Sequence, residues 1–225
     1  MGRLARGLLV LSLLFGLGYP LSWDLGWPDS LTTAWKGAGV GLLALLAAVE
    51  ARDKDGWLLA VVLACGALGD ILLVGSLTAG AIAFMIGHVV AIRLYLRHRP
   101  ERLSSGRTAL ALLVIAVSVP IAWSLPADRA QALGVALYAS FVAVMAAAAW
   151  ISRFPRTLTG AGAMMFLASD LLIFARMGPI AGAAWAGAAI WLLYYGGQVA
   201  ITMGVRNVLA TRASWSSPGG APPSG

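Results

Sequence analysis

The sequence is a series of long apolar runs separated by short stretches of Pro, Gly and charged residues. Roughly 20 apolar residues cross the ~30 Å hydrocarbon core of a bilayer, and only helices and closed barrels satisfy their backbone groups there. These runs are continuous and do not alternate apolar with polar residues, so they favour helices over barrel strands. Hydrophobic residues make up 60% of the chain and charged residues 11%. We therefore expect an all-α, polytopic integral membrane protein.

The breaks between the runs divide the chain into eight candidate transmembrane helices. We expect them near residues 4–21, 35–50, 56–74, 77–96, 108–125, 131–151, 158–175 and 181–204. Together they form one transmembrane domain over residues 1–204, followed by a disordered cytoplasmic tail over residues 205–225. No A-x-A-like cleavage site follows the first apolar run, so we interpret it as a retained helix and not as a secretory signal.

The basic residues are distributed unequally between the two sides that this topology defines. With the N-terminus inside, thirteen of the sixteen Lys and Arg residues fall on the inner side, and only Lys36, Arg129 and Arg176 fall on the outer side. Because cytoplasmic loops retain basic residues, we expect both termini in the cytoplasm and the protein in the cell membrane. The net charge of +7 then reflects topology and anionic lipid head groups, and it does not indicate nucleic-acid binding.

Three ionisable residues lie inside apolar runs: Asp70, Asp170 and His88. An ionised group in hydrocarbon is costly, so such residues normally face a protein interior or a watery cavity and mark a functional site. On the expected topology each aspartate lies about five residues from the outer end of its helix, or ~7 Å deep. His88 lies about eleven residues from the outer end, or ~16 Å deep. Convergence of the three is therefore a hypothesis.

Helical spacing places each polar group on a face that it shares with small or aromatic residues. The faces are Gly66, Gly69, Asp70 and Leu73 in the third helix, Gly80, Phe84, Gly87, His88 and Ala91 in the fourth, and Trp191, Tyr194, Gln198 and Thr202 in the eighth, with Tyr195 adjacent. These faces could line a common cavity. Structural roles stay open: a buried aspartate can be protonated and hydrogen-bonded to a neighbouring helix, and the tyrosines can simply pack.

These residues resemble the motifs of the YhhN-type lysoplasmalogenase family of eight-helix membrane proteins. The matching motifs are Gly69-Asp70, Phe84 with Gly87-His88, Phe166 with Ser169-Asp170, and Tyr194-Tyr195 with Gln198. The resemblance covers the chain from about Lys36 to Gly204. The family usually has Lys-Pro at the start of the second helix and an aromatic residue soon after the histidine, whereas this chain has Lys36-Gly37 and Val89. The resemblance implies hydrolysis of the vinyl ether bond of lysoplasmalogen to a fatty aldehyde and a glycerophospho-head group.

A vinyl ether is cleaved by acid, so the implied reaction needs a proton donor that is still protonated near neutral pH. Burial and a neighbouring carboxylate keep one carboxylic acid of a pair protonated, and the other can stabilise a cationic intermediate. We therefore expect Asp70 and Asp170 to be catalytic, with His88 moving a proton or holding an aspartate in position. The candidate substrate-binding residues are Lys36, Ser169, Trp191, Tyr194, Tyr195 and Gln198. Lys36 could meet a phosphate, and the aromatic residues an ammonium head group. We expect no cofactor.

Two other functions remain open at this stage. One histidine and two aspartates could bind a catalytic zinc that activates water against an amide or ester. The aspartates could instead be the protonation sites of a small transporter, which would be expected to have broken helices and binding groups at the midplane. The sequence makes no prediction of the oligomeric state.

Overall fold

The computed structural model describes residues 1–215, which form helices and contain no strand. The helices are α1 (Arg3–Gly18), α2 (Asp29–Glu50), α3 (Lys54–Gly75), α4 (Leu77–Arg97), α5 (Ser105–Ser124), α6 (Ala132–Ile151), α7 (Ala161–Arg176) and α8 (Ala184–Trp215). With the short helical turns that adjoin α1, α6 and α7, all eight segments are long and apolar enough to cross a membrane. The predicted all-α bundle of eight membrane-spanning helices is confirmed, and it fits a multi-pass membrane protein.

Two helix boundaries, the start of α2 and the end of α8, differ from the sequence prediction by more than three residues. Helix α2 begins at Asp29, before the expected residue 35, because Pro28 precedes it and an acidic side chain in the first turn suits the positive end of the helix dipole. Helix α8 begins at Ala184 and continues past residue 204 to Trp215, so part of the expected tail is helical. The remainder of that tail, residues 216–225, lies outside the described residues.

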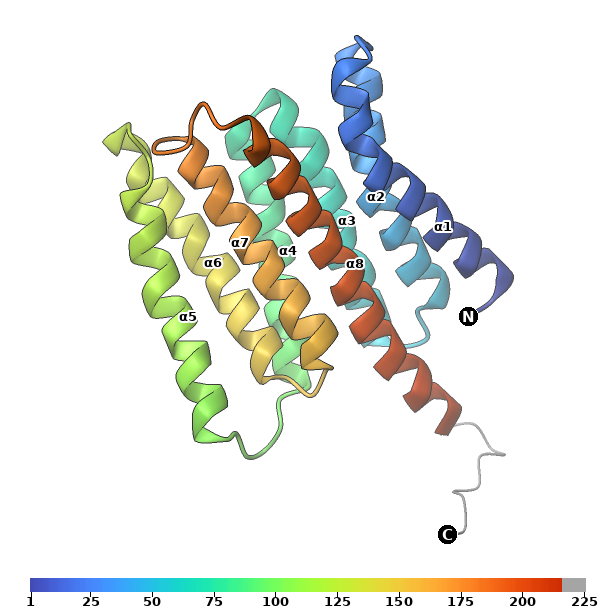
Figure 1. The fold of residues 1–225 in the computed structure, drawn as a ribbon. Coiled ribbons are helices and arrows are strands. Elements are labelled where there is room, and N and C mark those ends of the chain that lie inside the picture. Colours follow the sequence, from blue (N-terminus) through green and yellow to red (C-terminus); the bar gives the residue numbers. More distant parts are fainter. Residues whose placement is uncertain (216–225) are drawn as a thin grey trace.

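Consecutive helices run in opposite directions, so their connections alternate between two ends of the bundle (Figure 1). We call the top of Figure 1 the upper end and the opposite end, where the chain begins, the lower end. Helix α6 is the most enclosed, with 61% of its apolar stretch buried, against 17% for α1 and for α5. The main core is built from α2, α3, α4, α6, α7 and α8, with α1 and α5 at the periphery.

Helices α7 and α8 approach closely because glycine faces glycine between them. A Cβ on Gly162 would lie 2.7 Å from the carbonyl oxygen of Gly197, and one on Gly197 would lie 2.6 Å from the carbonyl oxygen of Gly162. Small residues at such a contact let two membrane helices pack backbone against backbone. This contact fixes the register of α7 against α8, and with it the relative positions of Asp170 and Tyr194.

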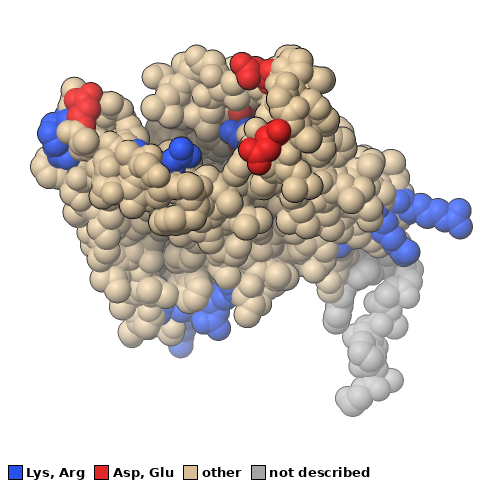
Figure 2. Space-filling model, turned by 45° about the horizontal axis from the view of Figure 1, so that its top comes forward, with Lys and Arg blue, Asp and Glu red and all other residues tan. Residues whose placement is uncertain are grey.

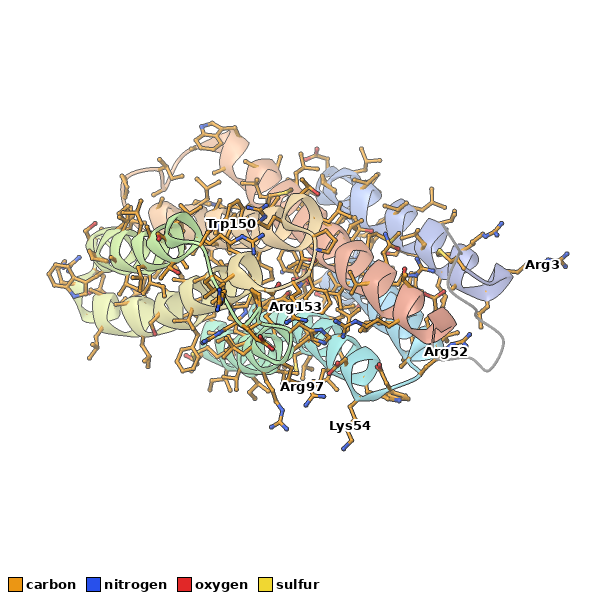
Figure 3. The ribbon with its side chains drawn as sticks, turned by 90° about the horizontal axis from the view of Figure 1, so that it is seen from below. Arg3, Arg52, Lys54, Arg97, Trp150 and Arg153 are labelled. Carbon is orange, nitrogen blue, oxygen red and sulfur yellow. The ribbon has the colours of Figure 1, made fainter. Side chains whose placement is uncertain are left out.

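The lower end carries most of the basic residues and the ion pairs that join distant helices. Figure 3 shows Arg52, Lys54, Arg97 and Arg153 at this end. Arg206 of α8 donates two hydrogen bonds to the carboxylate of Glu50 at the end of α2. The charge distribution agrees with a cytoplasmic lower end, and the orientation itself stays a prediction.

Candidate active site

A cavity of about 410 Å³ lies in the upper half of the bundle. Figure 2, which turns the upper end toward the viewer, shows the surface hollowed there. Residues of α2, α3, α4, α6, α7 and α8 line the cavity, and most of them are apolar. The polar lining residues are Lys36, Asp70, Thr78, Gln131, Tyr138, Ser169, Asp170 and Tyr194. The structure therefore brings both intramembrane aspartates to one largely apolar cavity of the size that small-molecule sites have.

Asp70 has a cation and a hydroxyl donor as partners. The residue is 2% exposed, and its carboxylate lies 3.5 Å from the Nζ atom of Lys36. The hydroxyl of Tyr194 donates a 2.7 Å hydrogen bond to Asp70 Oδ2. Lys36 also donates to the backbone carbonyl of Asp70. Lys36 and Tyr194 are thus predicted site residues that the structure places on Asp70.

Asp170 has a different set of partners, although it is similarly buried. Its Oδ2 atom has no hydrogen-bond partner within residues 1–215. Its carboxyl group interacts with the side chain of Tyr138 and with the charge of Asp70. None of the salt bridges found in the described part of the chain involves Asp170. The two aspartates are therefore chemically inequivalent: one is paired with a cation and the other is not.

His88 lies outside the main cavity and is connected to it by Tyr138. It does not line the large cavity, but lines an adjacent small one of about 20 Å³. Its Nε2 atom lies 3.3 Å from the hydroxyl of Tyr138, which lines the large cavity. Its ring also makes an edge-to-face contact with Phe166. The greater depth expected for His88 is thus seen in the structure, and Tyr138 spans the difference.

Gln198 shares the small cavity with His88. Its amide lies against Gly66, where an added Cβ would come within 2.9 Å of Gln198 Nε2. The side chain of Gln198 also interacts with Tyr194. Gln198 therefore supports Tyr194 from below and does not contact the main cavity.

The remaining predicted residues of α7 and α8 divide into cavity wall and packing. Trp191 lines the cavity while its indole N–H donates to the carbonyl of Gly16 at 2.6 Å, which ties α8 to α1. Ser169 lines the cavity and donates to the carbonyl of Ile190 at 3.0 Å. Tyr195 points away from the cavity, and its hydroxyl lies 2.8 Å from Ser12 Oγ. Tyr195 thus packs against α1 and does not contact the site.

The sequence analysis missed Tyr138, Gln131 and Thr78 as cavity residues. Tyr138 carries a hydroxyl in the middle of an apolar run, and a buried hydroxyl needs a partner, so that signal was present in the sequence. Thr78 and Gln131 lie at helix ends, where polar residues are ordinary. Only their tertiary placement identifies them as cavity residues.

Two structural observations bear on the alternative functions. Within residues 1–215 no three His, Cys, Asp or Glu side chains are grouped so that they could hold a metal ion. Helices α3, α4 and α8 run past the cavity without interruption, whereas the transporter alternative predicts broken helices. Neither observation favours an alternative over acid–base chemistry by the two aspartates.

Comparison with known proteins gives one result that bears on identity. No curated protein and no solved structure gave a significant match to this chain. The model of the YhhN family matches residues 31–205, from the first turn of α2 to the lower part of α8. The matched segment contains all of the cavity-lining residues, and the chain therefore belongs to the YhhN family.

Proposed function

We propose that this protein is a membrane-embedded hydrolase that cleaves the vinyl ether bond of lysoplasmalogen. The products are a fatty aldehyde and glycerophosphoethanolamine or glycerophosphocholine. The observation that carries the proposal is the pair of buried, inequivalent carboxyl groups in one apolar cavity among membrane-spanning helices. Membership of the YhhN family supports it.

The reaction needs a proton donor and a carboxylate of the protein that both contact the same substrate molecule. Protonation of the vinyl carbon beta to the ether oxygen gives an oxocarbenium ion, which water then attacks to form a hemiacetal. Paired carboxyl groups do comparable work in glycosidases, which pass through a similar cation. A cavity with few polar groups also strengthens the electrostatic attraction between a carboxylate and the cation.

The surroundings of the two aspartates support a different role for each. Asp70, with Lys36 and the Tyr194 hydroxyl as partners, is suited to act as the carboxylate. Asp170, which forms no salt bridge within residues 1–215, is suited to act as the acid. Asp170 protonates the vinyl carbon, and Asp70 stabilises the cation and accepts a proton from the attacking water. In the collapse of the hemiacetal, Asp70 protonates the departing glyceryl oxygen while Asp170 takes the hydroxyl proton, which restores both groups.

His88 acts in this scheme as a positioning residue. It contacts neither aspartate directly, but its ring nitrogen lies within hydrogen-bonding distance of the Tyr138 hydroxyl. Tyr138 in turn interacts with Asp170. His88 therefore orients Tyr138, and Tyr138 orients the acid.

An assay of the purified protein tests the proposal directly. Lysoplasmalogen and the corresponding ester lysophospholipid are supplied in parallel, and aldehyde and fatty acid are measured by mass spectrometry. We expect aldehyde from the vinyl ether lipid only, and a loss of about 10²- to 10⁴-fold in Asp70→Asn and in Asp170→Asn. In D₂O the aldehyde should carry one deuterium on the carbon next to the carbonyl, because the mechanism protonates that carbon.

Three results would overturn the proposal. Cleavage of the ester lipid alone would assign a different substrate. Aldehyde release that survives both substitutions would remove the aspartates from the mechanism. Activity that is lost on treatment with a chelator and restored by zinc would support the metal-dependent alternative.

A further inference from the structure

The exposed lining residues of the cavity lie on α4, on α6 and in the short turn before α6. Six of its lining residues are exposed at the protein surface. They are Leu77, Thr78 and Ile82 of α4, Gln131 in the short turn before α6, and Gly134 and Leu137 of α6. The lining residues contributed by α2, α3, α7 and α8 are all buried or half-buried.

The neighbouring sides of the cavity are closed by tight packing. Between α3 and α4, a Cβ on Gly69 would lie 2.6 Å from the ring of Phe84. Between α7 and α8, the Ser169 hydroxyl donates a hydrogen bond to the carbonyl of Ile190 at 3.0 Å. The contact between His88 and Tyr138 joins α4 to α6 below the opening. The opening is thus bounded on the sides and below.

The rim of the opening changes from polar to apolar with depth. Thr78 and Gln131 lie at the upper ends of their segments. Ile82 and Leu137 lie about 6–9 Å deeper, at 1.5 Å per residue, and are 48% and 56% exposed. Both helices are apolar enough to span a membrane, so these exposed leucine and isoleucine side chains face the hydrocarbon of one leaflet.

We propose that the opening between α4 and α6 is the entrance by which a single-chain lipid moves sideways from the leaflet at the upper end into the cavity. This inference rests on the proposed function and specifies how its substrate arrives. The chain passes between Ile82 and Leu137, and the head group stays near Thr78 and Gln131 at the polar rim. If the basic lower end is cytoplasmic, the lipid comes from the outer leaflet.

Gly134 offers a way to narrow this entrance without disturbing the helix packing. It lines the cavity, and an added Cβ there would meet no atom within 4 Å. We expect Gly134→Trp to reduce kcat/KM for the long-chain lysolipid by at least about tenfold. Gly182→Trp is the matched control: Gly182 is also at the upper end with open space around it, but it does not line the cavity. The control should keep wild-type kcat/KM, and both variants should keep the wild-type thermal midpoint.

Photo-crosslinking tests the entrance independently of catalysis. A lysolipid with a non-cleavable alkyl ether and a photoreactive group in its chain is bound to the wild-type protein, and the labelled peptides are mapped. We expect labels within residues 77–85 and 131–138, and much weaker labelling of Gly134→Trp. Labels confined to other helices, or equal labelling of wild type and Gly134→Trp, would overturn the entrance. An absence of aldehyde release with labelling at α4 and α6 would instead overturn the hydrolase proposal and leave the entrance intact.

Discussion

The upper and lower halves of the bundle are held together in different ways. Within residues 1–215, the upper half contains a cavity of about 410 Å³ and one ion pair between helices, and Asp170 Oδ2 has no hydrogen-bond partner there. In the lower half, Glu50 pairs with Arg206 between α2 and α8. There Asp55 of α3 also accepts hydrogen bonds from Arg97 and His98, each at 2.7 Å.

His98 shows how densely the lower half is connected. Its ring lies against Phe154, beyond the end of α6, and its backbone carbonyl accepts a hydrogen bond from the Arg153 amide at 2.8 Å. Its Nδ1 atom lies 3.1 Å from Arg212 of α8. One residue therefore links α3, α4, the α6–α7 connection and α8. We infer that the contacts of the lower half hold the helices in place, and that the upper half can therefore contain a cavity.

Removal of a lower-half ion pair tests whether the lower half stabilises the bundle. Glu50→Gln leaves Arg206 half-buried without its carboxylate, because the two side chains are only 22% and 12% exposed. We expect a loss of about 1–3 kcal/mol of stability, between the values for exposed and for buried pairs. Thermal unfolding in detergent measures it, with little change in activity at low temperature.

Two further variants control this prediction. Glu101→Gln removes an exposed acidic group near the same end and should leave the midpoint unchanged. Adding Arg206→Met to Glu50→Gln should recover part of the loss, because no unpaired cation then remains. If Glu50→Gln is as stable as wild type, this ion pair does not hold the helices of the lower half together.

The adjacent tyrosines of α8 allow a site residue and a packing residue of the upper half to be compared. Tyr194→Phe removes the hydroxyl that donates to Asp70, and we expect kcat to fall about tenfold, or ~1.4 kcal/mol. Tyr195→Phe removes only the contact with Ser12, so activity should stay at the wild-type level while stability falls by about 1 kcal/mol. Equal losses of activity in the two variants would contradict the separation of site from packing.

The same two tyrosines show how much of the site can be predicted from the sequence. Successive residues of a helix point about 100° apart, and the shared motif does not say whether Tyr194 or Tyr195 faces the cavity. Hydropathy predicted the eight helices, and the energetic cost of buried carboxyl groups pointed to Asp70 and Asp170. The role of Tyr138 and the opening between α4 and α6 depend on which non-consecutive helices meet, which local patterns do not encode.

The smallest expected effect is a difference in stability between the asparagine variants of the two aspartates. Asp170→Asn keeps the shape of a buried group that forms no salt bridge within residues 1–215, so we expect an unchanged midpoint or a gain of up to about 1 kcal/mol. Asp70→Asn should instead lose about 1 kcal/mol, because Lys36 is left without its counter-charge. Equal shifts in both variants would make the aspartates equivalent and remove the basis for their separate roles. A gain confined to Asp170→Asn would mean that the protein retains this carboxyl group at the expense of stability, as expected for a group kept for its chemistry.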